Sequence, residues 1–213
     1  MCASAIFLKN RKQLFAHLAW LSVCVANLSG CAWTPQGIEL PDISSWELRQ
    51  EVLGDLRKWQ FKGRIAVKAG TEGFNGKFDW SQDGGSFNAT VSGPLGVGTV
   101  QIAGSAGSIA LTDSDGIETL LVDAESELYY LYGWTIPVAS LRYWALGIPD
   151  PRTTAETSFD QQGRLIELQQ NDWIVEISQY RERDGQEMPR NLTATNANTR
   201  VRMVIDKWIF YER

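Results

Sequence analysis

Cysteine and histidine, the residue types that most often carry chemistry, are few in this chain and lie near its start. The 213 residues include three cysteines and one histidine, at Cys2, His17, Cys24 and Cys31. A cysteine thiol can act as a nucleophile, ligate a metal, form a disulfide or carry a covalent group. Cys31 ends the tetrapeptide Leu-Ser-Gly-Cys, so the chemistry of the chain depends first on how residues 1–30 are interpreted.

Residues 1–30 have the order of regions typical of a secretory signal. Cations between positions 9 and 12 are followed by a mainly apolar run from Leu14 to Leu28, which is too short and too interrupted for a comfortable membrane span. The small residues before Cys31 match a bacterial lipobox. This resemblance implies that Cys31 receives diacylglycerol on its sulfur, becomes the first residue after cleavage and is acylated on its new amine. The alternatives are an ordinary signal with a chance cysteine and an anchor helix that is never cut.

Cleavage before Cys31 restricts the chemistry of the remaining 183 residues, a length typical of one domain. The removed segment holds three cations and no acid, so the net charge moves from −5 to −8. Such an acidic chain would repel nucleic-acid phosphates. Without histidine or a free thiol, it has no Ser-His-Asp triad, cysteine nucleophile or histidine metal site. Carboxylate chemistry remains open, but the glycine-rich stretch 93–98 lacks the lysine of a phosphate cradle. We expect no cofactor, no metal and no enzymatic activity.

The elements that follow begin with a tether and a helix. Residues 31–41 hold the lipidated cysteine and a stretch with two prolines and a glycine, which predicts no regular structure. Residues 42–213 form the folded domain. Ser44 and Glu47 have the spacing of a capping box, which predicts a helix that ends near Lys58.

From Trp59 onward apolar residues alternate with polar ones, as in strands with one buried face. Glycine-rich and Asp-Gly turns separate about five such strands before residue 112 and five more between 154 and 205. Two helices are predicted between these sets, at 123–132 and at 137–147, the second bounded by Pro137 and Gly147. A sheet of roughly ten strands must curl, split or close. The sequence therefore predicts a mainly β (α+β) domain whose single antiparallel sheet curls into an unclosed barrel with a helical lid.

Several segments together resemble the LolB family of outer-membrane lipoprotein receptors. They are Phe61–Val67, Gly76–Trp80, Ser92–Gly96, Leu141–Pro149, Met188–Leu192 and Val204–Trp208. The pattern Leu-Arg-x-Trp-x-Leu-Gly-x-Pro in Leu141–Pro149 is the most specific of them. The resemblance implies an unclosed barrel of about eleven strands around a hydrophobic cavity, in agreement with the reading from periodicity.

The resemblance also implies a function. Members of the family take lipid-modified proteins from the periplasmic carrier LolA and insert them into the inner leaflet of the outer membrane. The chain would be a lipid-anchored monomer of the outer membrane that faces the periplasm and binds acyl chains. Ala32 follows Cys31, and an aspartate there would have favoured retention in the inner membrane.

Two sets of residues are candidates for this function. Phe78, Trp80, Trp144 and Trp173 are predicted as a group to line the cavity, although each taken singly is more readily explained as ordinary core. Pro94, Leu95 and Gly96 form a turn in which the family pattern implies an exposed leucine that contacts the membrane. The alternative is that Leu95 folds back onto the core.

Two other functions fit the same sequence. A lipoprotein that carries another hydrophobic ligand or lipid would need the same cavity, and ligand that copurifies with the protein would distinguish it. A structural lipoprotein would have a filled core instead of a cavity. The identity of the cargo, the exact number of strands and the exposure of Leu95 are not decided by the sequence.

Overall fold

The first residue that the structure describes is Gly37. The computed structural model describes residues 37–41, 43–96, 98–105, 108–132, 135–183 and 185–211. The signal segment and Cys31 lie outside the described residues. The predicted tether is too long at its C-terminal end, because the Ile38 amide donates to the Phe210 carbonyl at 2.9 Å and Leu40 is buried. Residues 37–41 therefore belong to the folded unit.

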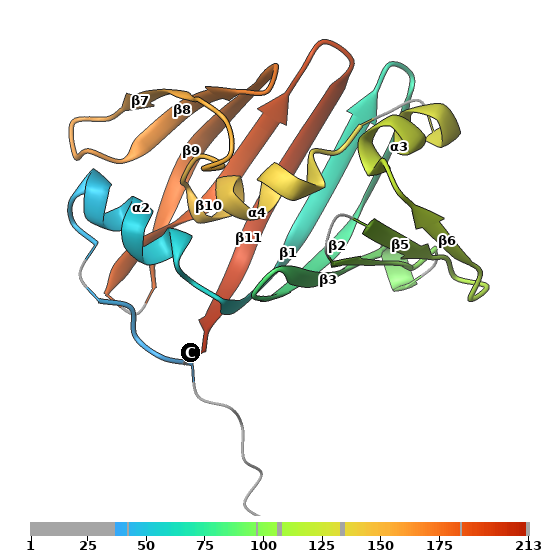
Figure 1. Cartoon of the computed structure of the whole chain (residues 1–213), viewed down its shortest axis with the longest axis horizontal. Helices are drawn as coiled ribbons and strands as arrows, with labels where there is room; N and C mark the ends of the chain where they lie inside the picture. Colours follow the sequence, from blue (N-terminus) through green and yellow to red (C-terminus); the bar gives the residue numbers. More distant parts are fainter. Residues whose placement is uncertain are drawn as a thin grey trace, which may run out of the picture. The chain divides into compact units, whose positions relative to one another are not determined.

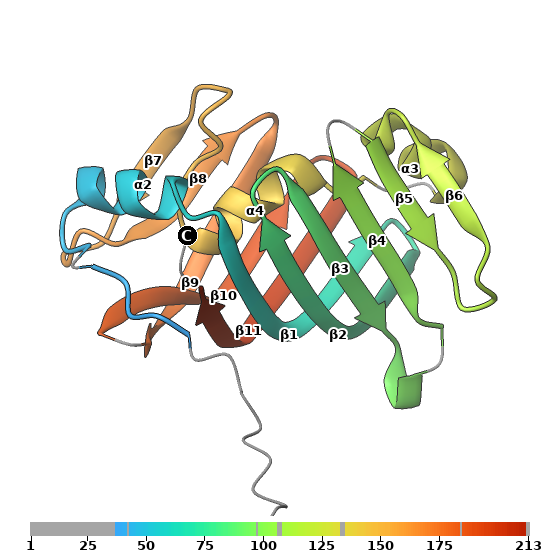
Figure 2. The ribbon, with the colours of Figure 1, turned by 60° about the horizontal axis from the view of Figure 1, so that its bottom comes forward.

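Eleven antiparallel strands form a single sheet (Figure 1). They are β1 (Lys58–Ala69), β2 (Glu72–Asp83), β3 (Ser86–Ser92), β4 (Val100–Ser105), β5 (Ser108–Thr112), β6 (Glu118–Leu121), β7 (Glu156–Phe159), β8 (Leu165–Gln170), β9 (Trp173–Arg183), β10 (Gln186–Thr195) and β11 (Thr199–Phe210). Their order is β6-β5-β4-β3-β2-β1-β11-β10-β9-β8-β7. The end strands β6 and β7 are not paired with each other, and Figure 2 shows the curled, open sheet. The predicted unclosed barrel is confirmed.

Ten of these strands were predicted from alternation, and β6 was missed. Its four residues carry only one buried side chain, Leu121, while Leu120 is 61% exposed. A strand this short at the edge of a sheet has too little buried face to show period two.

One irregularity in the sheet explains a glycine of the predicted family segments. In the β1–β11 pair, Lys62 faces Lys207 but Gly63 faces Ile205, so Asp206 is an extra residue. This bulge lets both Ile205 and Trp208 point to the buried face. The backbones of β1 and β11 lie very close together here. A Cβ on Gly63 would lie 2.2 Å from the Val204 carbonyl oxygen, so this position requires glycine.

The first described helix, α2 (Trp46–Gly54), differs from its prediction at both ends. Its cap is Ser45, which accepts from the Leu48 amide at 3.2 Å, and not Ser44. The chain enters the helix one residue later because Ile43 is buried and donates to Gln186 of β10. The helix ends at Gly54, four residues before Lys58, which already belongs to β1.

The two middle helices cover the inner face of the sheet. They are α3 (Ala124–Tyr132) and α4 (Val138–Leu146), as predicted. Gly147 ends α4 with φ of 74° and donates to the Trp144 carbonyl at 3.0 Å, the αL cap that favours glycine. Figure 1 shows α4 crossing the concave side of the sheet and α3 beside β5. Among the described residues, no helix is long and apolar enough to span a membrane.

Candidate functional site

An apolar cavity of about 430 Å³ lies between the first half of the sheet and the two lid helices. Its walls are the inward side chains of β1–β5, such as Ile102 and Leu111, and its cover is formed by Leu128 of α3 and Val138 and Leu141 of α4. Among the described residues that line it, Asn75 has the single polar side chain. Its volume lies in the usual range for sites that bury a small apolar ligand.

The four aromatic candidates divide into two pairs. Phe78 and Trp80, on neighbouring inward positions of β2, line the cavity. Trp80 stacks on Phe87 of β3, with ring centroids 4.4 Å apart, which stiffens this wall. Trp144 and Trp173 do not line it; they pack on each other at 6.1 Å and are almost fully buried. The sequence pattern alone could not make this separation, because all four are buried aromatic residues of the predicted strands and lid.

Trp144 instead anchors the lid. Its indole N–H donates to Gln170 Oε1 of β8 at 2.9 Å. The amide nitrogen of Gln170 donates to the carbonyls of Asp150 and Thr153 at 2.8 and 2.9 Å. One buried glutamine therefore holds both α4 and the segment that follows it, which explains the tryptophan in the most specific of the predicted motifs.

Asp150 completes this buried network. Its carboxylate accepts from Ser140 Oγ at 2.9 Å and from the backbone and guanidinium of Arg152. Burial alone would raise the pKa of Asp150, but the hydrogen bonds from Arg152 and Ser140 outweigh it and hold this pKa below that of a free aspartate. In its charged form the carboxylate therefore ties Ser140, near the start of α4, to the segment that follows the helix.

A buried arginine joins α2 to the C-terminal end of α4. Arg49 donates to the Leu146 carbonyl at 3.2 Å and to the Glu187 carbonyl at 2.9 Å. Its guanidinium lies 5.6 Å from the ring centre of Tyr180. Burial lowers the pKa of Arg49 and raises that of Tyr180 to about 12. The carbonyl group of Leu146, the last residue of α4, is thus bonded from a second helix.

Beside the cavity is a more polar hollow of about 370 Å³ that shares Phe87, Ile109 and Val138 with it. Arg142 of α4 and Asp123 line this hollow. Arg142 donates to the Gly84 carbonyl at 3.4 Å. The polar hollow therefore adjoins the apolar cavity at three shared residues.

The predicted turn forms a 3₁₀ helix, η1 (Pro94–Gly96), between β3 and β4. Pro94 and Gly96 are exposed, and the side chain of Leu95 lies outside the described residues. Gly96 has φ of 80° and its amide bonds back to the Gly93 carbonyl at 3.0 Å. Figure 2 shows η1, in light green after the arrowhead of β3, projecting clear of the sheet. The bond from Gly96 closes the turn, and Gly93 and Gly98, on either side of η1, line the cavity.

An unclosed antiparallel sheet with a helical lid over an apolar cavity defines the fold class of this chain. A solved structure of a LolA superfamily protein from Nitrosomonas europaea has a similar fold, with a TM-score of 0.50 and 7% sequence identity. The similarity covers 75% of this chain and 88% of that protein.

Sequence comparison places the chain within one family of this class. Residues 57–208 match the family described as Outer membrane lipoprotein LolB. An outer-membrane lipoprotein LolB of Aeromonas hydrophila is 31% identical over 186 residues, 87% of this chain and 92% of that protein. One of Nitrosococcus oceani is 32% identical over 196 residues, 91% of this chain and 98% of that protein. The chain belongs to the LolB family.

Proposed function

We infer that this chain is an outer-membrane lipoprotein that faces the periplasm and is anchored through lipid on Cys31. It accepts lipid-modified proteins from a LolA-type carrier and inserts them into the inner leaflet of the outer membrane. The observation that carries this inference is the apolar cavity of about 430 Å³ under α3 and α4.

Acyl chains need such a shelter between a carrier and a bilayer. Each CH₂ exposed to water costs about 0.8 kcal/mol, and apolar side chains form nearly all of the cavity lining that is described. Transfer into a bilayer is then favourable by itself, so the cavity needs no bound nucleotide. We assign no catalytic step to any residue of the chain.

The edge of the lid, formed by β6, α3 and the residues between them, offers an apolar surface on which a loaded carrier would dock. Leu120 of β6 is 61% exposed, Val122 is 77% exposed and Tyr130 of α3 is 86% exposed. Leu128, on the same helix as Tyr130, lines the cavity. Large exposed apolar side chains that cluster in this way are typical of interaction surfaces.

The test uses a LolA-type carrier loaded with a labelled lipoprotein, without membranes. The acceptor is residues 32–213, which hold the whole compact unit and all eleven strands. Wild type should take the lipoprotein, and Ile102→Trp, which fills the cavity, should take several-fold less. Ile174→Trp adds the same bulk to an exposed position of β9 and should behave as wild type.

Two results would contradict the proposal. Equal acceptance by wild type and Ile102→Trp would show that cargo does not enter the cavity. If wild type took free phospholipid from vesicles but no lipoprotein from the carrier, the chain would be a carrier of another lipid.

A further inference from the structure

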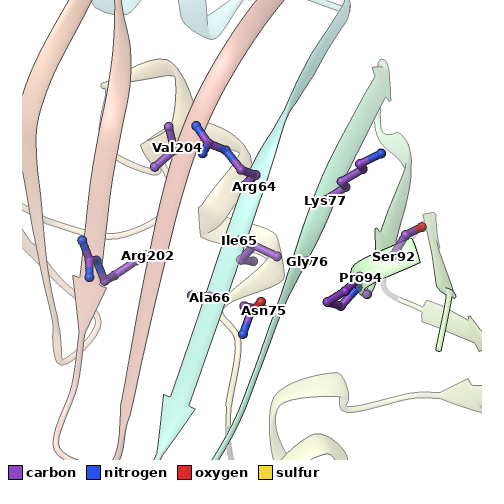
Figure 3. Close-up of a pocket in the computed structure, with 11 residues that line it drawn as sticks. Arg64, Ile65, Ala66, Asn75, Gly76, Lys77, Ser92, Pro94, Arg202 and Val204 are labelled. Carbon is purple, nitrogen blue, oxygen red and sulfur yellow. The ribbon is translucent and has the colours of Figure 1, made fainter. Parts of the chain in front are cut away.

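A second hollow lies on the outer face of the sheet, opposite to the lid. It is an open groove of about 330 Å³ between β1, β2, β11 and η1. Three of the residues that line it are cations, Arg64, Lys77 and Arg202, and Pro94 of η1 lines it as well (Figure 3). Acceptance of cargo in the cavity uses none of these cations, so the groove needs its own explanation.

The strand register sets cations against each other at this end of the sheet. Arg64 is directly opposite Lys77 in the β1–β2 pair, and Lys68 is directly opposite Arg200 in the β1–β11 pair. All four side chains are exposed, and they alternate with buried neighbours on the other face. Like charges directly opposite each other destabilise a sheet. The Arg64–Lys77 pair lines the groove, whereas Lys68 lies four residues further along β1 and, like Arg200, does not line it. An anion bound in the groove would offset the repulsion between Arg64 and Lys77.

The described carboxylates neutralise only part of this charge. Arg64 pairs with Asp206 at 3.1 Å. Neither Lys77 nor Arg202 has an ion-pair partner in the part of the chain that the structure describes. The groove therefore presents at least two cations that are available to an external anion.

The position of the groove indicates where the anion comes from. Pro94 belongs both to η1 and to the groove. Gly76 lets the end of β3, which leads into η1, lie close to the groove, because a Cβ on Gly76 would lie 2.4 Å from the Ser92 carbonyl oxygen. If η1 meets a bilayer, these cations lie beside the lipid phosphates. The cleaved chain has a net charge of −8, so an anionic surface repels it as a whole and a local basic patch is needed to orient it.

We propose that the groove lined by Arg64, Lys77 and Arg202 binds the phosphate-bearing headgroups of an anionic bilayer and thereby docks η1 on the membrane. The inference rests on the proposed delivery function for the place of η1 at the membrane. The groove shares Ile65, Asn75 and Gly93 with the cavity, but its three cations do not line the cavity. The test of the inference needs neither cargo nor carrier.

The test measures how residues 32–213 partition onto lipid vesicles. One set of vesicles is phosphatidylcholine alone, and the other is phosphatidylcholine mixed with phosphatidylglycerol. Wild type should bind the anionic set more tightly, and added salt should weaken this binding. The double variant Lys77→Gln with Arg202→Gln should bind the anionic set at least about fivefold more weakly, since each basic residue near such a surface contributes roughly that factor. Its melting temperature should not fall, because repulsion with Arg64 is relieved.

A matched control removes the same charge from a like-charged pair on the same face that does not line the groove. Lys62 and Lys207 are directly opposite each other and exposed, so Lys62→Gln with Lys207→Gln should bind as wild type does. An equal loss in both double variants would show that only net charge matters and would overturn the proposal. If inorganic phosphate at constant ionic strength displaced the protein from the vesicles, the groove would be a site for the free ion, and this result would also overturn the proposal.

Two further results separate this inference from the proposed function. If the groove variants bind vesicles normally but accept cargo slowly from the carrier, the groove is a protein-docking site and the proposal is wrong. If wild type accepts cargo but shows no preference for anionic vesicles, the groove proposal fails and the function stands.

Discussion

Trp144 of the lid helix donates its indole N–H to Gln170 of β8 over 2.9 Å. Both side chains are buried, and the same glutamine also accepts from the Asp150 amide at 2.9 Å. The lid is thus attached to the second half of the sheet, whereas the cavity lies under the first half. Because the anchor and the cavity occupy different strands, the cover of the cavity can be altered without breaking the attachment of α4.

We predict that Gln170→Leu destabilises the protein by about 2–4 kcal/mol. The substitution leaves the Trp144 N–H and the Asp150 amide without their buried acceptor. Urea unfolding followed by tryptophan fluorescence measures the effect. Gln169→Leu is the control, because Gln169 is the exposed neighbour on the same strand, and it should change stability by less than about half a kcal/mol. A small effect of Gln170→Leu would show that water replaces the glutamine.

The charged form of Asp150 should make stability depend on pH. The pKa of Asp150 is lower in the folded protein than in the unfolded chain, where it is about 3.9. This carboxylate therefore contributes stability that is fully present above pH 5 and is lost as the pH falls through the folded pKa. Asp150→Asn should be less stable than wild type at pH 7, and the difference in unfolding free energy should shrink below about pH 4. Asp172→Asn, at an exposed turn, should show no such change, and a constant difference for Asp150→Asn would contradict the pairing.

The sequence was most informative where a pattern is local. Period-two alternation located ten strands, and Pro137 and Gly147 marked the ends of α4. The sequence-based prediction failed where a tertiary contact sets the boundary of an element. Ile43 bonds to Gln186, 143 residues away, and α2 is capped by Ser45 in place of the expected Ser44.

Only part of the candidate site could be predicted, because the sequence shows which residues face inward but not which tertiary contacts they make. Phe78 and Trp80 line the cavity as expected, but an inward tryptophan on α4 looks identical in sequence whether it faces a cavity or an anchor such as Gln170. The outer groove had no sequence signal, because Lys77 and Arg202 lie far apart in the chain and meet only through the register of β1 with both of its neighbours.

Gly63→Ala should destabilise the sheet by about 3 kcal/mol. The added Cβ would lie 2.2 Å from a backbone oxygen of β11, and neither strand can shift without disturbing the bulge at Asp206. Thermal unfolding measures the loss. Gly54→Ala is the control, because nothing lies within 4 Å of its Cβ position at the end of α2, and it should raise stability by about 0.5 kcal/mol. Equal melting temperatures would show that the bulge relaxes freely.

The last prediction concerns η1 and separates acceptance of cargo from its delivery. Leu95 lies between the exposed residues Pro94 and Gly96 in η1. We predict that Leu95→Glu changes the melting temperature little, since substitutions at exposed positions usually shift stability by less than about half a kcal/mol. The cavity is unchanged, so the variant should still take lipoprotein from the carrier.

Delivery by Leu95→Glu should fail, because a carboxylate resists entry into the apolar part of a bilayer and is repelled by anionic headgroups. Leu95→Phe should deliver normally, since it keeps apolar area at the same place. Melting temperature, acceptance from the carrier and insertion of labelled cargo into liposomes are measured for both variants. A large fall in the melting temperature of Leu95→Glu would place the leucine in the core. Normal insertion of cargo by this variant would show that η1 does not enter the membrane and that delivery depends on another part of the surface.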